Sequence, residues 1–196
     1  MVGNLNNINI GSIMKTVPIL RLIFGIMFFF HVIVASSQSN QPDSSIVVDM
    51  VTHRYPELKG YVGLVVPIYT LSNDGNTLNG EDNFVIGNPW GINIWKSQRF
   101  GFSFEFTPFL KFNSQESKMS NIMFHPGVLY RIGHEYTLIG RVAYETSGRY
   151  GFTPIINKVL VRTPTNTFFV AGLLPVRFGN NHAPSVTVAV QFGIGF

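Results

Sequence analysis

The sequence predicts an all-β fold: an eight-stranded antiparallel up-and-down transmembrane β-barrel, preceded by a cleavable signal peptide. Three observations lead to this prediction. Apolar residues recur at every second position over most of the chain, which is the periodicity of a strand with one apolar face. Charged residues make up only 12% of the chain, about half of the roughly 25% typical of soluble proteins. Several alternating segments exceed the roughly 5–6 residues usual in soluble sheets and suit the tilted transmembrane strand of about 9–11 residues.

The N-terminal segment has the features of an export signal. Two basic residues, Lys15 and Arg21, precede an apolar run over residues 22–34, and small residues suited to cleavage follow that run. The run is shorter than the roughly 20 residues of a membrane-spanning helix, which favours cleavage over a retained anchor. We therefore expect a signal peptide over residues 1–37, with Met14 as an alternative translation start.

The mature chain divides into a lead-in segment, residues 38–58, and a barrel, residues 59–196. The lead-in contains a β-like stretch at 46–54, which we interpret as a plug or a lead-in strand. The barrel contains eight alternating segments, at residues 60–69, 84–95, 99–112, 121–132, 136–145, 151–161, 167–178 and 185–196. Turn-forming residues separate these segments. Three of the longer connections, expected on the outer side, are 70–83, 113–120 and 179–184.

The third segment separates its two faces most clearly. A row of phenylalanines from Phe100 to Phe106 alternates with Gly, Ser and Glu, and Phe109 is the only large apolar residue of the second face. A soluble, lipocalin-like barrel would turn the second face to water, where Lys and Glu are common. Small residues fit a narrow lumen better, and an even strand number with alternating short and long connections is typical of outer-membrane barrels. The soluble lipocalin-like binder is the alternative.

Aromatic residues near the segment ends predict two girdles at the membrane interfaces. The residues expected at the outer rim are Tyr69, Trp90, Phe112, Tyr144 and Phe178. Those expected at the inner rim are Trp95, Phe100, Tyr136 and Phe196.

The face that turns into the lumen carries polar residues whose charges have to be balanced. The lumen candidates are Asn93, Glu105, Lys111, His125, Arg131, Arg141, Glu145, Arg177 and Gln191. Glu105 and Arg141 lie in the middle of the third and fifth segments, and His125 lies in the segment between them. Buried charges must be paired, so we predict a lumen network of Glu105, His125 and Arg141. Its simplest role is structural, and a proton or ion path is the alternative.

The residue content argues against several other functions. The chain has no cysteine, which excludes disulfides and thiolate chemistry, and without a basic stripe nucleic acid is not an expected partner. No histidine is followed two positions later by serine, the pair found in outer-membrane lipid A deacylases. His182 could meet Ser72 or Asp74 at the outer rim, but residues of any loops could meet in this way, so the contact does not indicate a catalytic site. The acidic connection 70–83 lacks the twelve-residue calcium pattern. We expect no enzyme activity, metal or cofactor.

The last segment, SVTVAVQFGIGF, ends on an aromatic residue after a run of alternating apolar ones. The positions that carry this pattern are Val188, Val190, Phe192, Ile194 and Phe196. The segment resembles the C-terminal signal of bacterial outer-membrane β-barrel proteins, which the barrel-assembly machinery reads. The chain is similar to small outer-membrane barrels of Bacteroidetes-type bacteria. The resemblance implies a monomer in the cell outer membrane, with membrane lipid and the assembly machinery as partners.

This resemblance implies no particular activity. An eight-stranded barrel has an interior just wide enough for side chains to fill, so we expect no wide pore. The sequence therefore favours a structural or surface-interaction role in the outer membrane. The alternatives are a narrow channel or transporter component for small solutes, and a lipid-modifying enzyme.

Overall fold

The computed structural model describes residues 54–133 and 135–196. The predicted signal peptide, the alternative start and almost all of the lead-in lie outside the described residues and stay predictions. No helix in the described part of the chain is long and apolar enough to cross a membrane. The regular structure of that part consists of β-strands.

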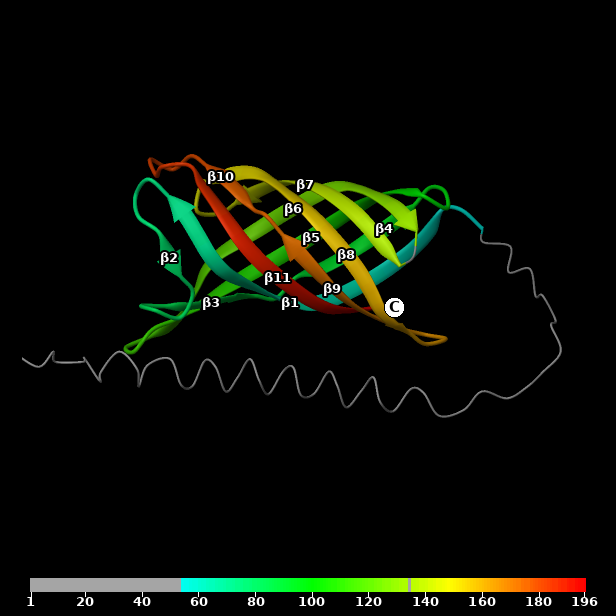
Figure 1. Ribbon diagram of the computed structural model, residues 1–196, viewed down its shortest axis with the longest axis horizontal. Coiled ribbons are helices and arrows are strands. Elements are labelled where there is room, and N and C mark those ends of the chain that lie inside the picture. The colour runs from blue at the N-terminus through cyan, green and yellow to red at the C-terminus, as the bar shows by residue number, and fades with distance from the viewer. Residues whose placement is uncertain (1–53, 134) are drawn as a thin grey trace, which may run out of the picture. The chain divides into compact units, whose positions relative to one another are not determined.

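Eleven antiparallel strands form one sheet that closes on itself (Figure 1). They are β1 (Glu57–Ser72), β2 (Thr77–Leu78), β3 (Phe84–Gly87), β4 (Trp90–Trp95), β5 (Phe100–Phe112), β6 (Ser117–Gly133), β7 (Tyr136–Glu145), β8 (Tyr150–Arg162), β9 (Thr167–Leu173), β10 (Val176–Phe178) and β11 (Ser185–Gly195). The last strand pairs with the first from Tyr61 opposite Gly195 to Ser72 opposite Ser185, which closes the barrel.

Eight strand positions make up the ring. β3 and β4 together form the second, β9 and β10 together form the seventh, and every neighbouring pair is antiparallel. The short strand β2 pairs only with the end of β1 and extends the first connection. The predicted all-β, eight-stranded antiparallel barrel is confirmed.

Two predicted strands are interrupted by proline. We expected continuous strands over 84–95 and 167–178, but the structure breaks them next to Pro89 and Pro175. Proline has no backbone N–H, so it cannot donate to the ladder of hydrogen bonds in a central strand. Its carbonyl still accepts, as in the bond of 2.8 Å that the Thr187 N–H donates to Pro175. The ring therefore stays closed around each break.

The apolar rows of the strands face outward. Phe102 and Phe106 are 39% and 48% exposed, whereas Ser103 and Thr107 on the opposite face of β5 are fully buried. A hydrocarbon surrounding requires this orientation, because the outer surface of a transmembrane barrel is an apolar band. It is the reverse of the lipocalin-like alternative, in which the apolar row would point inward.

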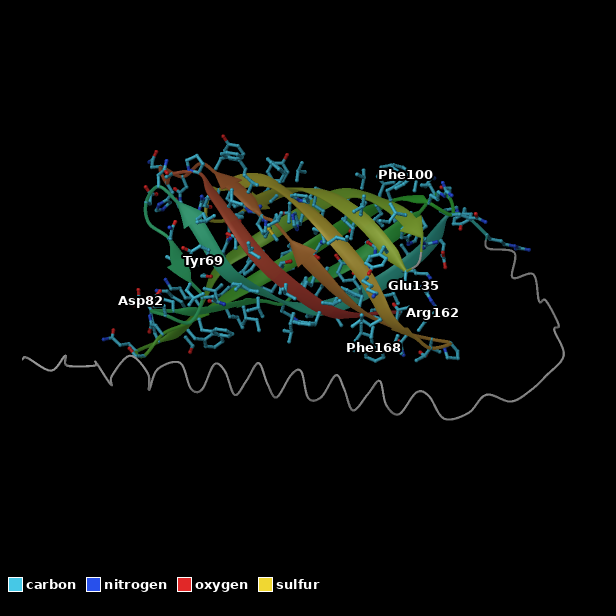
Figure 2. The ribbon with its side chains drawn as sticks, viewed as in Figure 1. Tyr69, Asp82, Phe100, Glu135, Arg162 and Phe168 are labelled. Atoms are coloured by element: carbon cyan, nitrogen blue, oxygen red, sulfur yellow. The ribbon has the colours of Figure 1, made fainter. Side chains whose placement is uncertain are left out.

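The connections fall at two ends of the barrel. Strand β1 begins and strand β11 finishes at one end of the barrel, which we call the inner end. The β4–β5, β6–β7 and β8–β9 connections also lie there (Figure 1). The opposite, outer end carries residues 73–83, 113–116, 146–149 and 179–184. Figure 2 shows Tyr69 and Asp82 towards the outer end and Glu135 and Arg162 at the inner end.

One outer connection is shorter than predicted. The sequence suggested a loop over 113–120, but β6 begins at Ser117 and pairs with β5 up to Phe112. The Asn113 side chain makes the tight turn possible, because its Oδ1 accepts the N–H groups of Gln115 and Glu116 at 2.9 and 2.8 Å. The polar composition of residues 113–120 predicted a loop, but the Asn113 side chain closes a four-residue turn and the rest of the segment belongs to β6.

Two of the predicted rim aromatics lie elsewhere. Trp95 is buried inside the lumen, where the Arg131 guanidinium carbon lies 4.2 Å from its ring centroid. Trp90 faces outward but pairs with Phe106 halfway along β5, so it lies in the middle of the wall rather than at the outer rim. The reason is the break at residues 88–89. It divides the second strand of the ring into β3, in the outer half, and β4, in the inner half, and Trp90 is the first residue of β4.

Candidate functional site: a polar septum in the lumen

The centre of the lumen holds a buried network around Glu105. Its Oε2 accepts hydrogen bonds from the Tyr61 hydroxyl and from Arg141 Nη1, both at 2.7 Å. Its Oε1 accepts one from the Thr107 hydroxyl at 3.2 Å and lies 3.1 Å from His125 Nδ1. The structure therefore brings together the three residues that the sequence analysis selected, Glu105, His125 and Arg141, and adds Tyr61 to them.

The strand register explains why these side chains meet. Tyr61 lies opposite Gly91, Gly91 opposite Glu105, and Glu105 opposite His125, across four neighbouring wall positions. Directly opposite residues of neighbouring strands point to the same face. One row of the sheet thus delivers a phenol, a carboxylate and an imidazole to the same level of the lumen.

Two glycines leave the space that the larger side chains occupy. A Cβ atom at Gly91 would lie 2.2 Å from the Tyr61 hydroxyl oxygen. A Cβ atom at Gly127 would lie 2.6 Å from Cγ of Arg141, which is opposite Gly127 in the ladder. The side chains of Tyr61 and Arg141 therefore lie over Gly91 and Gly127, respectively, and their polar ends reach Glu105.

Arg141 holds the network together. It is 3% exposed, and its Nη2 donates to the Tyr61 hydroxyl and to Ser103 Oγ, both at 2.9 Å. Together with the bond to Glu105 this makes a buried ion pair with neutral partners on both sides. Removing one member of such a pair leaves an uncompensated buried charge, which is strongly destabilising.

A chain of hydrogen bonds continues from the centre towards the outer end. His125 Nε2 lies 2.9 Å from the Thr153 hydroxyl, to which Arg177 Nη1 donates at 3.1 Å. Arg177 Nε donates to Glu145 Oε1 at 2.7 Å, and Glu145 Oε2 accepts from Asn121 Nδ2 at 2.7 Å. Bonded side chains thus run from the level of Glu105 to the rim.

The network divides the lumen into two cavities. The outer vestibule has a volume of about 440 Å³ and includes Glu105 and His125 in its lining. The inner vestibule has a volume of about 510 Å³ and includes Tyr61 and Arg141. Gln191 lines both. We call these five residues, Tyr61, Glu105, His125, Arg141 and Gln191, the septum.

The remaining lumen candidates also line these cavities. Lys111, Glu145 and Arg177 line the outer vestibule, and Asn93 and Arg131 line the inner one. Sequence reasoning missed Tyr61 and Thr153, for different reasons.

Both faces of β1 carry apolar residues, so alternation does not distinguish the inward Tyr61 from the outward Val62. Thr153 lies on the inward face of β8, and nothing in the sequence beyond its hydroxyl marks it as part of a network. For Tyr61, the sequence offers one hint: Gly91, on the neighbouring strand, leaves room for a large side chain.

The predicted assembly signal lies along the last strand. Phe196 is exposed, and its N–H and C=O both pair with Gly60 at 2.9 Å. A Cβ atom at Gly60 would lie 2.5 Å from the Phe196 ring, so the ring lies against the backbone of β1. Val188 and Ile194 face outward and are exposed.

The outer rim contains one histidine–carboxylate contact. His182 Nδ1 lies 3.8 Å from Asp74 Oδ2, which also accepts the Ala183 N–H at 2.7 Å. This contact joins the first and last outer connections. Within residues 54–133 and 135–196, no group of three His, Asp or Glu side chains could hold a metal ion.

No protein-family model matches the sequence, and no curated protein matches it. Two designed barrels are among the similar solved structures. The solution NMR structure of de novo designed TMB2.3 is 13% identical, with 71% of this chain and 91% of that chain covered and a TM-score of 0.37. A structure described as "De novo design of transmembrane beta-barrels" is 10% identical, with 71% and 98% covered and a TM-score of 0.38.

Proposed function

We propose that this chain is a small β-barrel of the bacterial outer membrane, closed to solute flow, with a structural or surface-interaction role. The septum carries this proposal. Its charged members, Glu105 and Arg141, are bonded to each other at 2.7 Å and are each 3% exposed. A solute could pass only if this buried ion pair separated, which would leave two charges without partners.

The outer-membrane location is supported by the surface and by the chain ends. Exposed apolar residues face outward on every wall position of the barrel. Both ends of the barrel chain lie at the inner end, as an even number of strands requires, and the longest connection, 73–83, lies at the other. The export features of residues 1–37 supply the route to that membrane.

Assembly through the barrel-assembly machinery is part of the same proposal. The terminal strand β11 is one of the two strands at the closing seam, and Phe196 completes that seam by pairing with Gly60. A machinery that reads Phe196 and the alternating apolar residues before it would engage one of the two strands that close the barrel.

Conductance across a planar lipid bilayer tests whether the lumen is closed. We expect no current steps from the purified protein. Replacing Tyr61, Glu105 and Arg141 together by alanine removes the ring and both charges, and should produce small steps. Replacing the outward residues Tyr136, Leu138 and Tyr144 by alanine is the control and should leave the bilayer silent. Current steps from the unaltered protein would contradict a closed barrel.

A narrow channel is the second candidate, and one observation favours it. The two vestibules are separated by a single layer of side chains, and Gln191 faces both. Movement of that layer alone would join them. Steps from the unaltered protein that change with solute would support this candidate over the closed barrel.

A further inference from the structure

We propose that the outer vestibule is a binding site for a small organic anion, namely a carboxylate with an apolar body. The inference deepens the proposed surface-interaction role and rests on it for the side of the membrane that the vestibule faces.

The outer vestibule has the size and lining of a small-molecule site. Its volume of about 440 Å³ lies within the range of roughly 300–1,000 Å³ that is usual for such sites. Val65 and Leu173 belong to the buried apolar cluster of the barrel, and Phe109 packs against that cluster; all three line the vestibule. The septum closes the bottom, so a ligand would enter and leave by the outer end.

Two cations of the vestibule wall have no carboxylate partner within the described residues, although the lining as a whole holds four carboxylates and three cations. The two deep carboxylates already have arginine partners at 2.7 Å, Arg141 for Glu105 and Arg177 for Glu145. Lys111 and Arg149 also line the vestibule, and neither forms a salt bridge with a carboxylate in the described part of the chain. Two half-buried cations are therefore left for an anion from outside.

Neutral oxygens hold Arg149 in place. Its Nη2 donates to the carbonyl oxygens of Arg177 and Ala183 at 3.3 and 3.2 Å and to Ser185 Oγ at 3.0 Å. Its Nε is buried without a partner in the described residues. The guanidinium is thus oriented by the protein while its charge stays available, and charge-assisted bonds to a carboxylate are the strongest that it can make.

Gln191 supplies an independent indication of a ligand. It is 3% exposed and lines the vestibule floor, and no hydrogen bond joins its side-chain amide to another described residue, although the amide atoms are not among the fully buried polar atoms that lack a partner. Nearly all buried polar side chains have a partner. A polar group on the ligand, at the end that enters first, would meet this amide.

The mouth of the vestibule carries the opposite charge. Glu81 and Asp82 line it from the exposed connection between β2 and β3. Water and salt screen charges at such positions, whereas half-buried charges are screened less. We therefore expect the wall cations to decide the sign of the ligand, and a cationic ligand is the alternative that the experiment has to exclude.

Benzoate and benzylamine are suitable probes, because they share a ring and differ in charge. Each is titrated into the full barrel in lipid nanodiscs, and backbone amide shifts are followed by NMR. We expect saturable shifts with benzoate at residues lining the outer vestibule and none with benzylamine. The variant Lys111→Gln should weaken benzoate binding by about tenfold or more, since it removes a bond to a charged group.

The matched control is Lys118→Gln. Lys118 lies directly opposite Lys111 in the ladder, but it is exposed and already bonded to Glu116, so benzoate binding should be unchanged. Benzylamine binding as tightly as benzoate, an unchanged affinity in Lys111→Gln, or no saturable benzoate shifts would each overturn the inference. A barrel that is silent in bilayers would still satisfy the closed-barrel proposal after any of these results.

Discussion

Gly91 and Gly127 determine which residues meet in the lumen. Alternation in the sequence already places Glu105, His125 and Arg141 on the inward face, because the parity of a position within a strand decides its face. Their meeting in one network was predicted, but the part that Tyr61 takes in it was not, since that part depends on Tyr61 and Arg141 lying across the two glycines. Register between strands is a property of the folded sheet, and alternation within one strand does not contain it.

Breaking the central ion pair tests the septum at the residue scale. The change Arg141→Met leaves the Glu105 carboxylate buried beside a neutral side chain. We expect the free energy of unfolding to fall by about 3–5 kcal/mol. The measurement is the urea midpoint of the purified barrel refolded into lipid vesicles.

The inner rim offers a matched ion pair for comparison. Arg162 and Glu135 are bonded at 2.5 Å, but both side chains are about half exposed. Because exposed pairs contribute about 0–1 kcal/mol, Arg162→Met should change the midpoint little. Similar losses in Arg141→Met and Arg162→Met would mean that Glu105 does not need its arginine.

At the scale of strands, periodicity identified the wall positions but not their interruptions. Alternation continues through Pro89 and Pro175 because side-chain direction does not depend on the ladder bonds that proline lacks. Composition likewise suggested a loop over 113–120, where Asn113 closes a short turn. Side-chain pattern therefore predicts faces well, whereas strand ends depend on individual hydrogen bonds.

Neighbouring positions on β11 test the assignment of faces. Val188 is exposed on the outer surface, whereas Thr187 lines the outer vestibule and bonds to Thr70 at 2.9 Å. A lysine in lipid costs about 2–4 kcal/mol at the bilayer midplane and less near the interface. Val188→Lys should therefore lower the free energy of unfolding by about 2 kcal/mol, and Thr187→Lys by less, as read from urea midpoints in vesicles. If Thr187→Lys were the more damaging change, the faces would be reversed.

At the scale of the whole molecule, closure and the divided lumen have different origins in the sequence. Eight alternating segments predict a ring, although pairing between β1 and β11 joins residues as distant as Tyr61 and Gly195. The expectation that side chains fill the interior holds only at the septum, because cavities of about 440 and 510 Å³ lie on either side. Strand count sets the width of a barrel, but the size of each inward side chain decides where it is filled.

Gel migration of the membrane-extracted protein in SDS, unheated against boiled, tests the central claim most directly. A closed barrel with an apolar outer surface stays folded in SDS until it is heated. We predict that the unheated protein runs at a shifted position, that boiling abolishes the shift, and that the protein is recovered in the outer-membrane fraction. A single position in both lanes, together with recovery as a soluble periplasmic protein, would contradict a membrane-spanning barrel.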